Sequence, residues 1–162
     1  MANVFIFPIA DLKAGTQAGV PAAEGCNLES LLPFFRDKSQ TDYLGQIYPD
    51  GKCYPWGVPE SVQNLASWNA MAKDDLVLGC REGSIVSAAY VWMKIRNPDL
   101  GARLWSRNAE DPFSLLCFTD EPQWGEVPIV EQMTNYLDRD CRGFTKLASE
   151  KRDNILRAYG SF

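Results

Sequence analysis

The amino-acid sequence predicts an α+β domain in which a small curved mixed sheet, or partial barrel, is flanked by short helices. Three observations support this fold class. Short runs of branched and aromatic residues, typical of strands, are interleaved with short segments of helical periodicity. Their order lacks the regular strand–helix–strand repeat of a parallel sheet. The 162 residues also contain no internal repeat, low-complexity tract or linker, so we expect residues 1–162 to form one domain.

The expected strands carry the clearest signals. Residues 85–96 alternate, and one nearly apolar face is formed by Ile85, Ser87, Ala89, Val91, Met93 and Ile95. This strand is expected at the centre of the sheet, in a hairpin with residues 76–80. Further strands are expected at residues 3–9, at residues 114–119 and in a short segment that ends at Trp56. Trp124 is expected in a loop that caps the edge of the barrel.

Helices are predicted from apolar spacing and from capping residues. Residues 28–37 are apolar, but Pro33 argues against a long helix. The next helix begins at Pro59 and places Val62, Leu65 and Trp68 on one face. Further helices are expected after Pro98 through Trp105, at residues 130–137, and from Ser149 to Gly160.

The absence of histidine is the most informative count in the sequence. It removes the commonest general base, the commonest zinc ligand and every serine–histidine or cysteine–histidine nucleophilic pair. The five cysteines include no Cys-x-x-Cys pair, which predicts reduced, mostly buried thiols. No acidic cluster indicates a metal held by oxygen ligands. We therefore expect a binding protein rather than an enzyme, with no cofactor and no metal.

The chain shows no membrane or export signal. No apolar run is long enough to span a bilayer, and MANVFIFPIAD lacks the basic flank and cleavage pattern of a signal peptide. We expect a cytoplasmic protein without a membrane partner.

The formal net charge of −5 argues against a nucleic-acid partner unless positive charge is clustered. Lys94, Arg96, Arg103 and Arg107 do lie close together in the sequence. Each can be an ordinary solvated side chain, and one or two can contact phosphates.

A series of short motifs gives a further indication of function. The motifs are VFIFPIAD, CYPWGVP, KDDLVLGC, GSIV, NPDLGARLW, GFTKL and RAYGSF, in that order. Their order is similar to that of the EVE and YTH-like domains of the PUA superfamily. It resembles most the amino-terminal modified-base readers of McrB-type, modification-dependent restriction systems. The resemblance covers nearly the whole chain, although each motif is short.

The resemblance implies a twisted β-barrel core with a pocket for one modified base turned out of its nucleic-acid strand. Trp56 and Trp105 match the positions of the family's cage tryptophans. The end of the first strand supplies polar contacts in the family, and Asp11 is the side chain there that can form a hydrogen bond. The sequence departs from the YTH pattern at this point. Packing or capping within the fold is the alternative role for each of these three residues.

Together these observations predict a non-catalytic reader of a modified base, most simply a methylated base in DNA. Two tryptophans and a carboxylate could enclose a methyl group and accept the remaining N–H of N6-methyladenine, which favours this base over 5-methylcytosine and 5-hydroxymethylcytosine. Cutting or translocation would belong to an effector nuclease or NTPase, as another domain or subunit. One alternative is an RNA reader of the same superfamily. The other is a small-molecule or protein-interaction domain, which the acidic charge favours.

Overall fold

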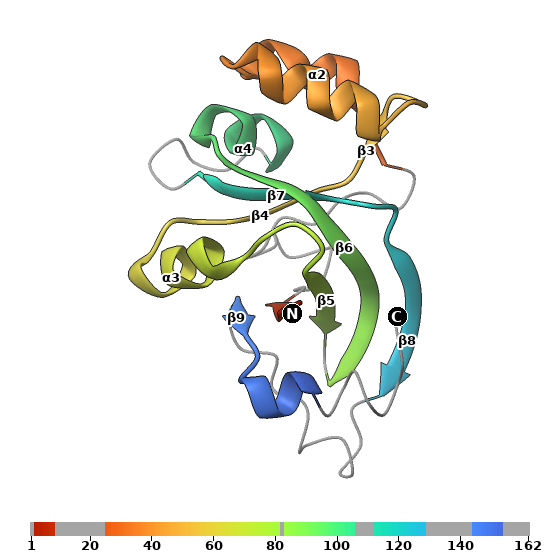
Figure 1. Ribbon diagram of the computed structural model, residues 1–162, viewed down its shortest axis with the longest axis vertical. Helices are drawn as coiled ribbons and strands as arrows, with labels where there is room; N and C mark the ends of the chain where they lie inside the picture. Colours follow the sequence, from red (N-terminus) through yellow and green to blue (C-terminus); the bar gives the residue numbers. More distant parts are fainter. Residues whose placement is uncertain (1, 9–24, 82, 106–111, 129–143, 154–162) are drawn as a thin grey trace.

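The computed structural model describes residues 2–8, 25–81, 83–105, 112–128 and 144–153 and has the predicted α+β architecture (Figure 1). Its main sheet has the order β4-β7-β6-β5-β1-β9, with β8 also paired to β6, while β2 pairs with β3. The strands are β1 (Val4–Pro8), β2 (Cys26–Asn27), β3 (Lys52–Cys53), β4 (Pro55–Val58), β5 (Leu76–Arg81), β6 (Ser84–Arg96), β7 (Leu115–Thr119), β8 (Gln123–Pro128) and β9 (Thr145–Lys146). Among the described strands this order ends at β4 and β9, so they do not close into a barrel.

β6 is the central strand, as predicted, because it pairs with β5, β7 and β8. The prediction of one apolar face along this strand is wrong. Its register shifts between Ile85 and Ser87 against β8, and between Val91 and Met93 against β7. Such irregularities interrupt the alternation of side chains between the two faces of a sheet. As a result, Ile85, Ala89 and Ile95, which were predicted to share a face, lie in three different apolar clusters.

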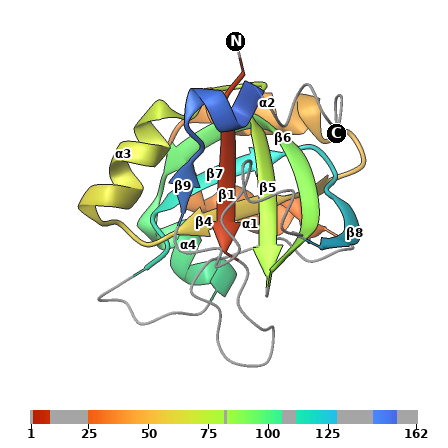
Figure 2. The ribbon, with the colours of Figure 1, turned by 90° about the horizontal axis from the view of Figure 1, so that it is seen from below.

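The strand order places β9, β1, β5, β6 and β8 side by side (Figure 2). β1 and β5 are parallel, and the other pairs of the sheet are antiparallel. Alternation along β1 separates two apolar sets, with Phe5 and Phe7 on one face and Val4 and Ile6 on the other. We call the first set, with its partners on other strands, the inner cluster. It consists of Phe5, Phe7, Trp56, Val58, Met71, Val77, Val86, Ala89, Val91, Leu115, Cys117 and Phe144.

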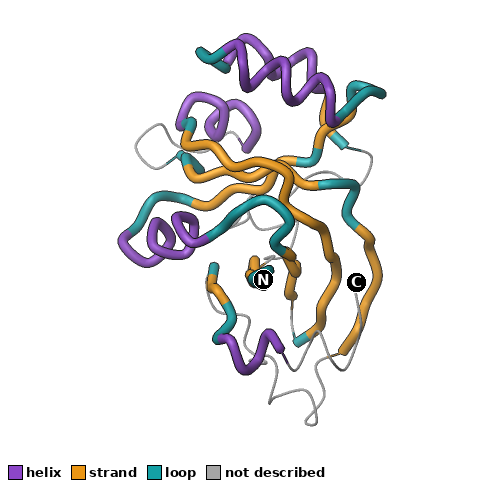
Figure 3. Tube along the Cα trace, viewed as in Figure 1, coloured by secondary structure: helices purple, strands orange, loops and turns teal. Residues whose placement is uncertain are grey.

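Helices cover both faces of the β4–β7 part of the sheet. They are α1 (Leu28–Leu31), η1 (Leu32–Phe34), α2 (Lys38–Ile47), α3 (Val62–Ala70) and α4 (Pro98–Trp105). α3 packs Leu65 and Trp68 against the inner cluster. On the opposite face, a further cluster joins residues of α1, η1, α2 and α4 to Leu116 and Phe118 of β7. Figure 3 shows α3 on one side of these strands and α2 and α4 on the other.

Capping side chains set the beginnings of the helices. Ser61 accepts a hydrogen bond from the Asn64 N–H (3.0 Å), and Asn97 accepts one from the Leu100 N–H (3.0 Å). Pro33 lies in η1 and limits α1 to one turn, as expected. α2 was not predicted, because Leu44 is its one buried residue and most of its side chains are polar. Its N-cap, Asp37, accepts from the Ser39 N–H at 2.8 Å.

Three further sequence predictions have different outcomes. Trp124 lies in strand β8 and not in a loop, so that prediction is wrong. Cys80 is disulfide-bonded, so the expectation that the thiols are all reduced is also wrong. A helix begins at residue 149 as predicted, whereas the predicted helix at 130–137 lies outside the described residues. None of the helices that the structure describes is long and apolar enough to cross a membrane.

Candidate functional site on the inner face of the sheet

Trp56, the first expected cage wall, is a core residue in this structure. It lies within β4, opposite Cys117 of β7, and is 0% exposed. Its indole Nε1–H donates a hydrogen bond to Thr119 Oγ1 at 2.9 Å, and its ring meets Phe7 edge-on at 5.3 Å between centroids. The strand was expected to end at Trp56 but continues to Val58, and pairing with β7 makes this segment a buried strand.

Trp105, the second expected cage wall, lies on the other side of β4. It ends α4, and its ring meets Phe113 edge-on at 5.5 Å. A Cβ added to Gly57 would lie 2.7 Å from a carbon of the Trp105 ring, so residue 57 faces Trp105. Adjacent residues of a strand face opposite sides, and Trp56 faces the inner cluster. The structure thus does not bring the two tryptophans together. Asp11, the third expected contact, lies outside the described residues.

The basic residues expected at phosphates make contacts within the fold. Lys94 Nζ donates to the carbonyl oxygens of Trp68 (2.8 Å) and Asn69 (3.1 Å), at the end of α3, and lies 4.5 Å from the centroid of the Trp68 ring. Partial burial lowers the pKa of Lys94. Arg96 donates to both carboxylate oxygens of Glu60, at 2.6 and 2.7 Å. Arg103 and Arg107 were also expected to contact phosphates: Arg103 lies in α4, and Arg107 lies outside the described residues.

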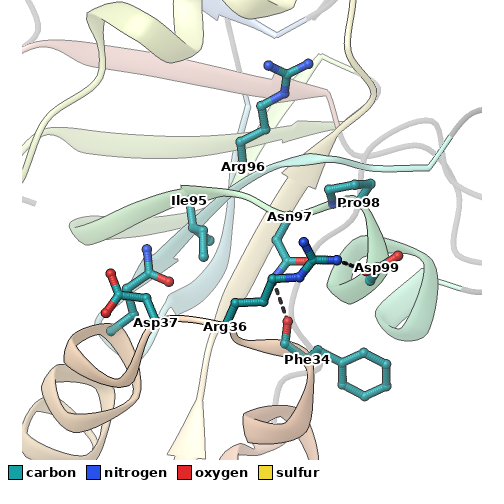
Figure 4. Close-up of a pocket in the computed structure, with 9 residues that line it drawn as sticks. Phe34, Arg36, Asp37, Ile95, Arg96, Asn97, Pro98 and Asp99 are labelled. Carbon is teal, nitrogen blue, oxygen red and sulfur yellow. Dashed lines mark hydrogen bonds and ion pairs between the residues drawn. The ribbon is translucent and has the colours of Figure 1, made fainter.

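A surface pocket of about 270 Å³ lies between η1, α2, the end of β6 and α4. Figure 4 shows Arg36 directed toward Asp99, and Arg96 pointing away from both. The Asn97 side chain is occupied, because its amide donates to the Phe34 carbonyl oxygen (2.9 Å) while its oxygen caps α4. Charges of both signs line this pocket, and the side chains of Arg36, Arg96 and Asn97 have partners within the fold. None of these three needs a ligand to satisfy it.

A different arrangement lies on the inner face, at the end of the sheet formed by β1, β5, β6 and β8. The registers pair Phe7 with Gly79, Gly79 with Ser87, and Ser87 with Trp124. Directly paired residues share a face of the sheet. The neighbouring row, Phe5–Val77–Ala89, belongs wholly to the inner cluster, as does Phe7. The four residues Phe7, Gly79, Ser87 and Trp124 therefore form one row on the inner face, which we call the inner-face row.

The inner-face row combines features that are typical of a ligand site. Ser87 is 3% exposed, yet its Oγ is the buried side-chain oxygen for which no hydrogen-bond partner is present among the described residues. Trp124 is 43% exposed, and it is one of two large apolar side chains exposed among the described residues. Gly79, between Phe7 and Ser87, adds no side chain. The row can thus offer an aromatic plane for stacking and a hydroxyl that can donate or accept a hydrogen bond.

Only weak signals for this row are present in the sequence. Ser87 interrupts an apolar alternation and is expected on a nearly apolar face, while Trp124, in EPQWGEVP, is expected in a loop. A serine among apolar residues was the signal that could have marked the site.

The groups needed for a metal site are missing from the part of the chain that the structure describes, where no three histidine, cysteine, aspartate or glutamate side chains come together. Comparison with known proteins adds no relative: no family model, no curated protein and no solved structure matches the chain.

Proposed function

We propose that this chain is a non-catalytic reader of a modified base in DNA, with N6-methyladenine as the favoured base. The observation that carries the proposal is the inner-face row, where exposed Trp124 and unpartnered Ser87 Oγ lie on the same face of the sheet. A base turned out of its strand could make contacts with both groups, because its flat ring can stack on the indole and its polar edge can form a hydrogen bond with the hydroxyl. Trp124 thereby takes the role that the sequence suggested for Trp56.

The energetics are consistent with a preformed site. Stacking of a base on an aromatic side chain is worth about 1–3 kcal/mol, and burial of one methyl group adds roughly 1 kcal/mol. Turning a base out of a duplex costs a few kcal/mol. The margin is small, so a rigid site is needed. Pairing of Ser87 with both Gly79 and Trp124 holds Ser87 between β5 and β8.

The architecture supports a PUA-like assignment as part of this proposal. The sheet is mixed, its central strand β6 pairs with β7 over one part and with β8 over another, and short helices flank it. This arrangement is compatible with a partial barrel of the EVE or YTH-like kind. In such a system the chain would recognise the base in the cytoplasm, and an effector nuclease or NTPase would act on the nucleic acid.

The test is a binding screen with DNA and RNA oligonucleotides that differ in one modified base. Fluorescence anisotropy should give the tightest binding to single-stranded or mismatched DNA with N6-methyladenine, and weaker binding to 5-methylcytosine or unmodified strands. Fluorescence of 2-aminopurine placed beside the target should rise as the base leaves the stack. Equal affinity for every modification would contradict the proposal.

A domain that binds a small molecule or a protein is the second candidate, and the net charge of −5 favours it. The dependence of affinity on salt separates the two. Binding to nucleic acid weakens as salt rises because counterions are released from phosphates, whereas binding of a neutral heterocycle does not.

A further inference from the structure

We infer that the Ser87 hydroxyl reads the hydrogen-bonding edge of the bound ring while Trp124 stacks on the ring, with Gly79 adding no side chain between them and Phe7. The inference rests on the proposed function and adds to it the residue that sets specificity. It also replaces Asp11, which the sequence suggested, as the group that recognises the polar edge of the base.

The first step concerns the hydroxyl. Buried polar side chains in proteins nearly always have a hydrogen-bond partner, since burial without one is unfavourable. The other buried polar side chains differ from Ser87 in this respect. Thr119 Oγ1 accepts from Trp56 and donates to the Asp120 carbonyl oxygen at 2.8 Å, and Asp75 accepts from the Asn3 N–H at 2.9 Å. An atom of a bound ligand would satisfy the Ser87 hydroxyl.

The second step concerns space. Along the inner-face row, side-chain size changes from large at Phe7 to absent at Gly79, small at Ser87 and large at Trp124. Ala89, the next inward residue of β6, is small as well. The two large aromatic residues are separated by β5 and β6, whose side chains in this row contribute few atoms. A flat ring that stacks on Trp124 can therefore direct one edge toward Ser87 and Gly79.

The third step concerns charge. Among the described residues, the neighbours of Ser87 on the inner face are apolar: Phe7, Val77, Val86 and Ala89. A charged ligand group would be left without a counterion there, which is unfavourable. The edge that reaches Ser87 is therefore neutral, with one polar atom and apolar groups beside it. The methylamino group of N6-methyladenine has this composition, because its N–H can donate to Ser87 Oγ while its methyl group packs against apolar neighbours.

The experiment compares two ligands of the same shape. Calorimetry measures the affinities of N6-methyl-2′-deoxyadenosine and of 6-ethylpurine 2′-deoxyriboside, in which a CH₂ group replaces the N–H. The affinity for N6-methyl-2′-deoxyadenosine divided by the affinity for the ethyl analogue should be about tenfold lower in Ser87→Ala than in the wild type. One hydrogen bond is worth about that factor. The matched control is Ser114→Ala, which removes another buried serine hydroxyl and should leave the ratio unchanged.

Thermal unfolding of the free protein provides a second readout. Ser87→Ala should keep or raise the melting temperature, because it removes a hydroxyl that has no partner. A clear loss of stability would mean that the hydroxyl has a partner within the fold, and would overturn the inference.

The outcomes separate this inference from the proposed function. If the wild type selects a modified oligonucleotide and Ser87→Ala keeps the same affinity ratio, the inference fails and the proposed function stands. If the protein distinguishes the two nucleosides through Ser87 but binds no oligonucleotide, the ring site stands and the nucleic-acid function fails. If neither nucleosides nor oligonucleotides bind, both fail.

Discussion

The two ends of the inner face carry one tryptophan each and differ in how completely the fold uses them. At the β4 end, Trp56 is fully buried, its N–H is bonded to Thr119, and α3 covers the cluster. At the β8 end, Trp124 is 43% exposed and the Ser87 hydroxyl beside it has no hydrogen-bond partner in the described part of the chain. The difference shows that the surroundings of a tryptophan, more than its sequence motif, decide whether it stabilises the fold or remains accessible to a ligand.

The largest expected effect is at the closed end. Trp56→Ala should lower the free energy of unfolding by about 3–5 kcal/mol, because it leaves a cavity in the core and removes the partner of Thr119. Denaturation by urea, followed by circular dichroism, measures this change. An unfolding free energy close to that of the wild type, with loss of base binding, would instead restore Trp56 as a cage wall.

The second prediction concerns the opposite side of β4. Gly57→Ala should cost about 1–3 kcal/mol of stability, because its Cβ would lie 2.7 Å from both the Leu116 side chain and the Trp105 ring. Gly125→Ala is the matched control in β8, since nothing lies within 4 Å of the Cβ it adds. Equal stability of the two variants would show that Trp105 does not pack over β4, and would reopen its assignment to the cage.

The strands and helices that the sequence predicted well are those defined by local signals. β1, β5, β6 and β7 are runs of branched and aromatic residues, and α3 begins at a serine cap. α2 and β8 were missed because tertiary contacts define them. Leu44 is the one buried residue of α2, and β8 depends on its pairing with β6. Local propensity contains little of this information.

The candidate site was harder to predict than the fold. Trp56 was selected from the Trp-Gly-Val-Pro motif, but its burial depends on pairing between residues far apart in the sequence. The inner-face row draws on four strands, and the shift in the register of β6 between Ile85 and Ser87 decides which face Ser87 occupies. A regular alternation with period two does not indicate where such a shift occurs.

The third prediction tests the open end. Trp124→Ala should lower the unfolding free energy by about 1 kcal/mol or less, well below the effect of Trp56→Ala, since 43% of the residue is exposed. The same variant should lose about 1–3 kcal/mol of affinity for an oligonucleotide with N6-methyladenine. Val62→Ala removes another exposed apolar side chain, 91% accessible on α3, and should bind as the wild type does. Unchanged affinity in Trp124→Ala would place the base elsewhere.

The smallest effect is expected at the end of β6 that lies away from Ser87 and Trp124. Arg96 and Glu60 form an exposed ion pair, with side chains that are 57% and 38% accessible, and such pairs contribute about 0–1 kcal/mol. Arg96→Ala should therefore change stability by less than about 1 kcal/mol, and by less still at high salt, where exposed charges are screened.

A strand rises about 3.3 Å per residue, so the stretch from Ser87 to Arg96 spans roughly 30 Å. The phosphates next to a base held at Ser87 are thus beyond the reach of Arg96. We therefore expect Arg96→Ala to show the same slope as the wild type when the logarithm of affinity is plotted against the logarithm of salt concentration. A slope reduced by about one unit would instead mean that Arg96 leaves Glu60 for a phosphate several nucleotides away, and that nucleic acid extends along the full length of β6.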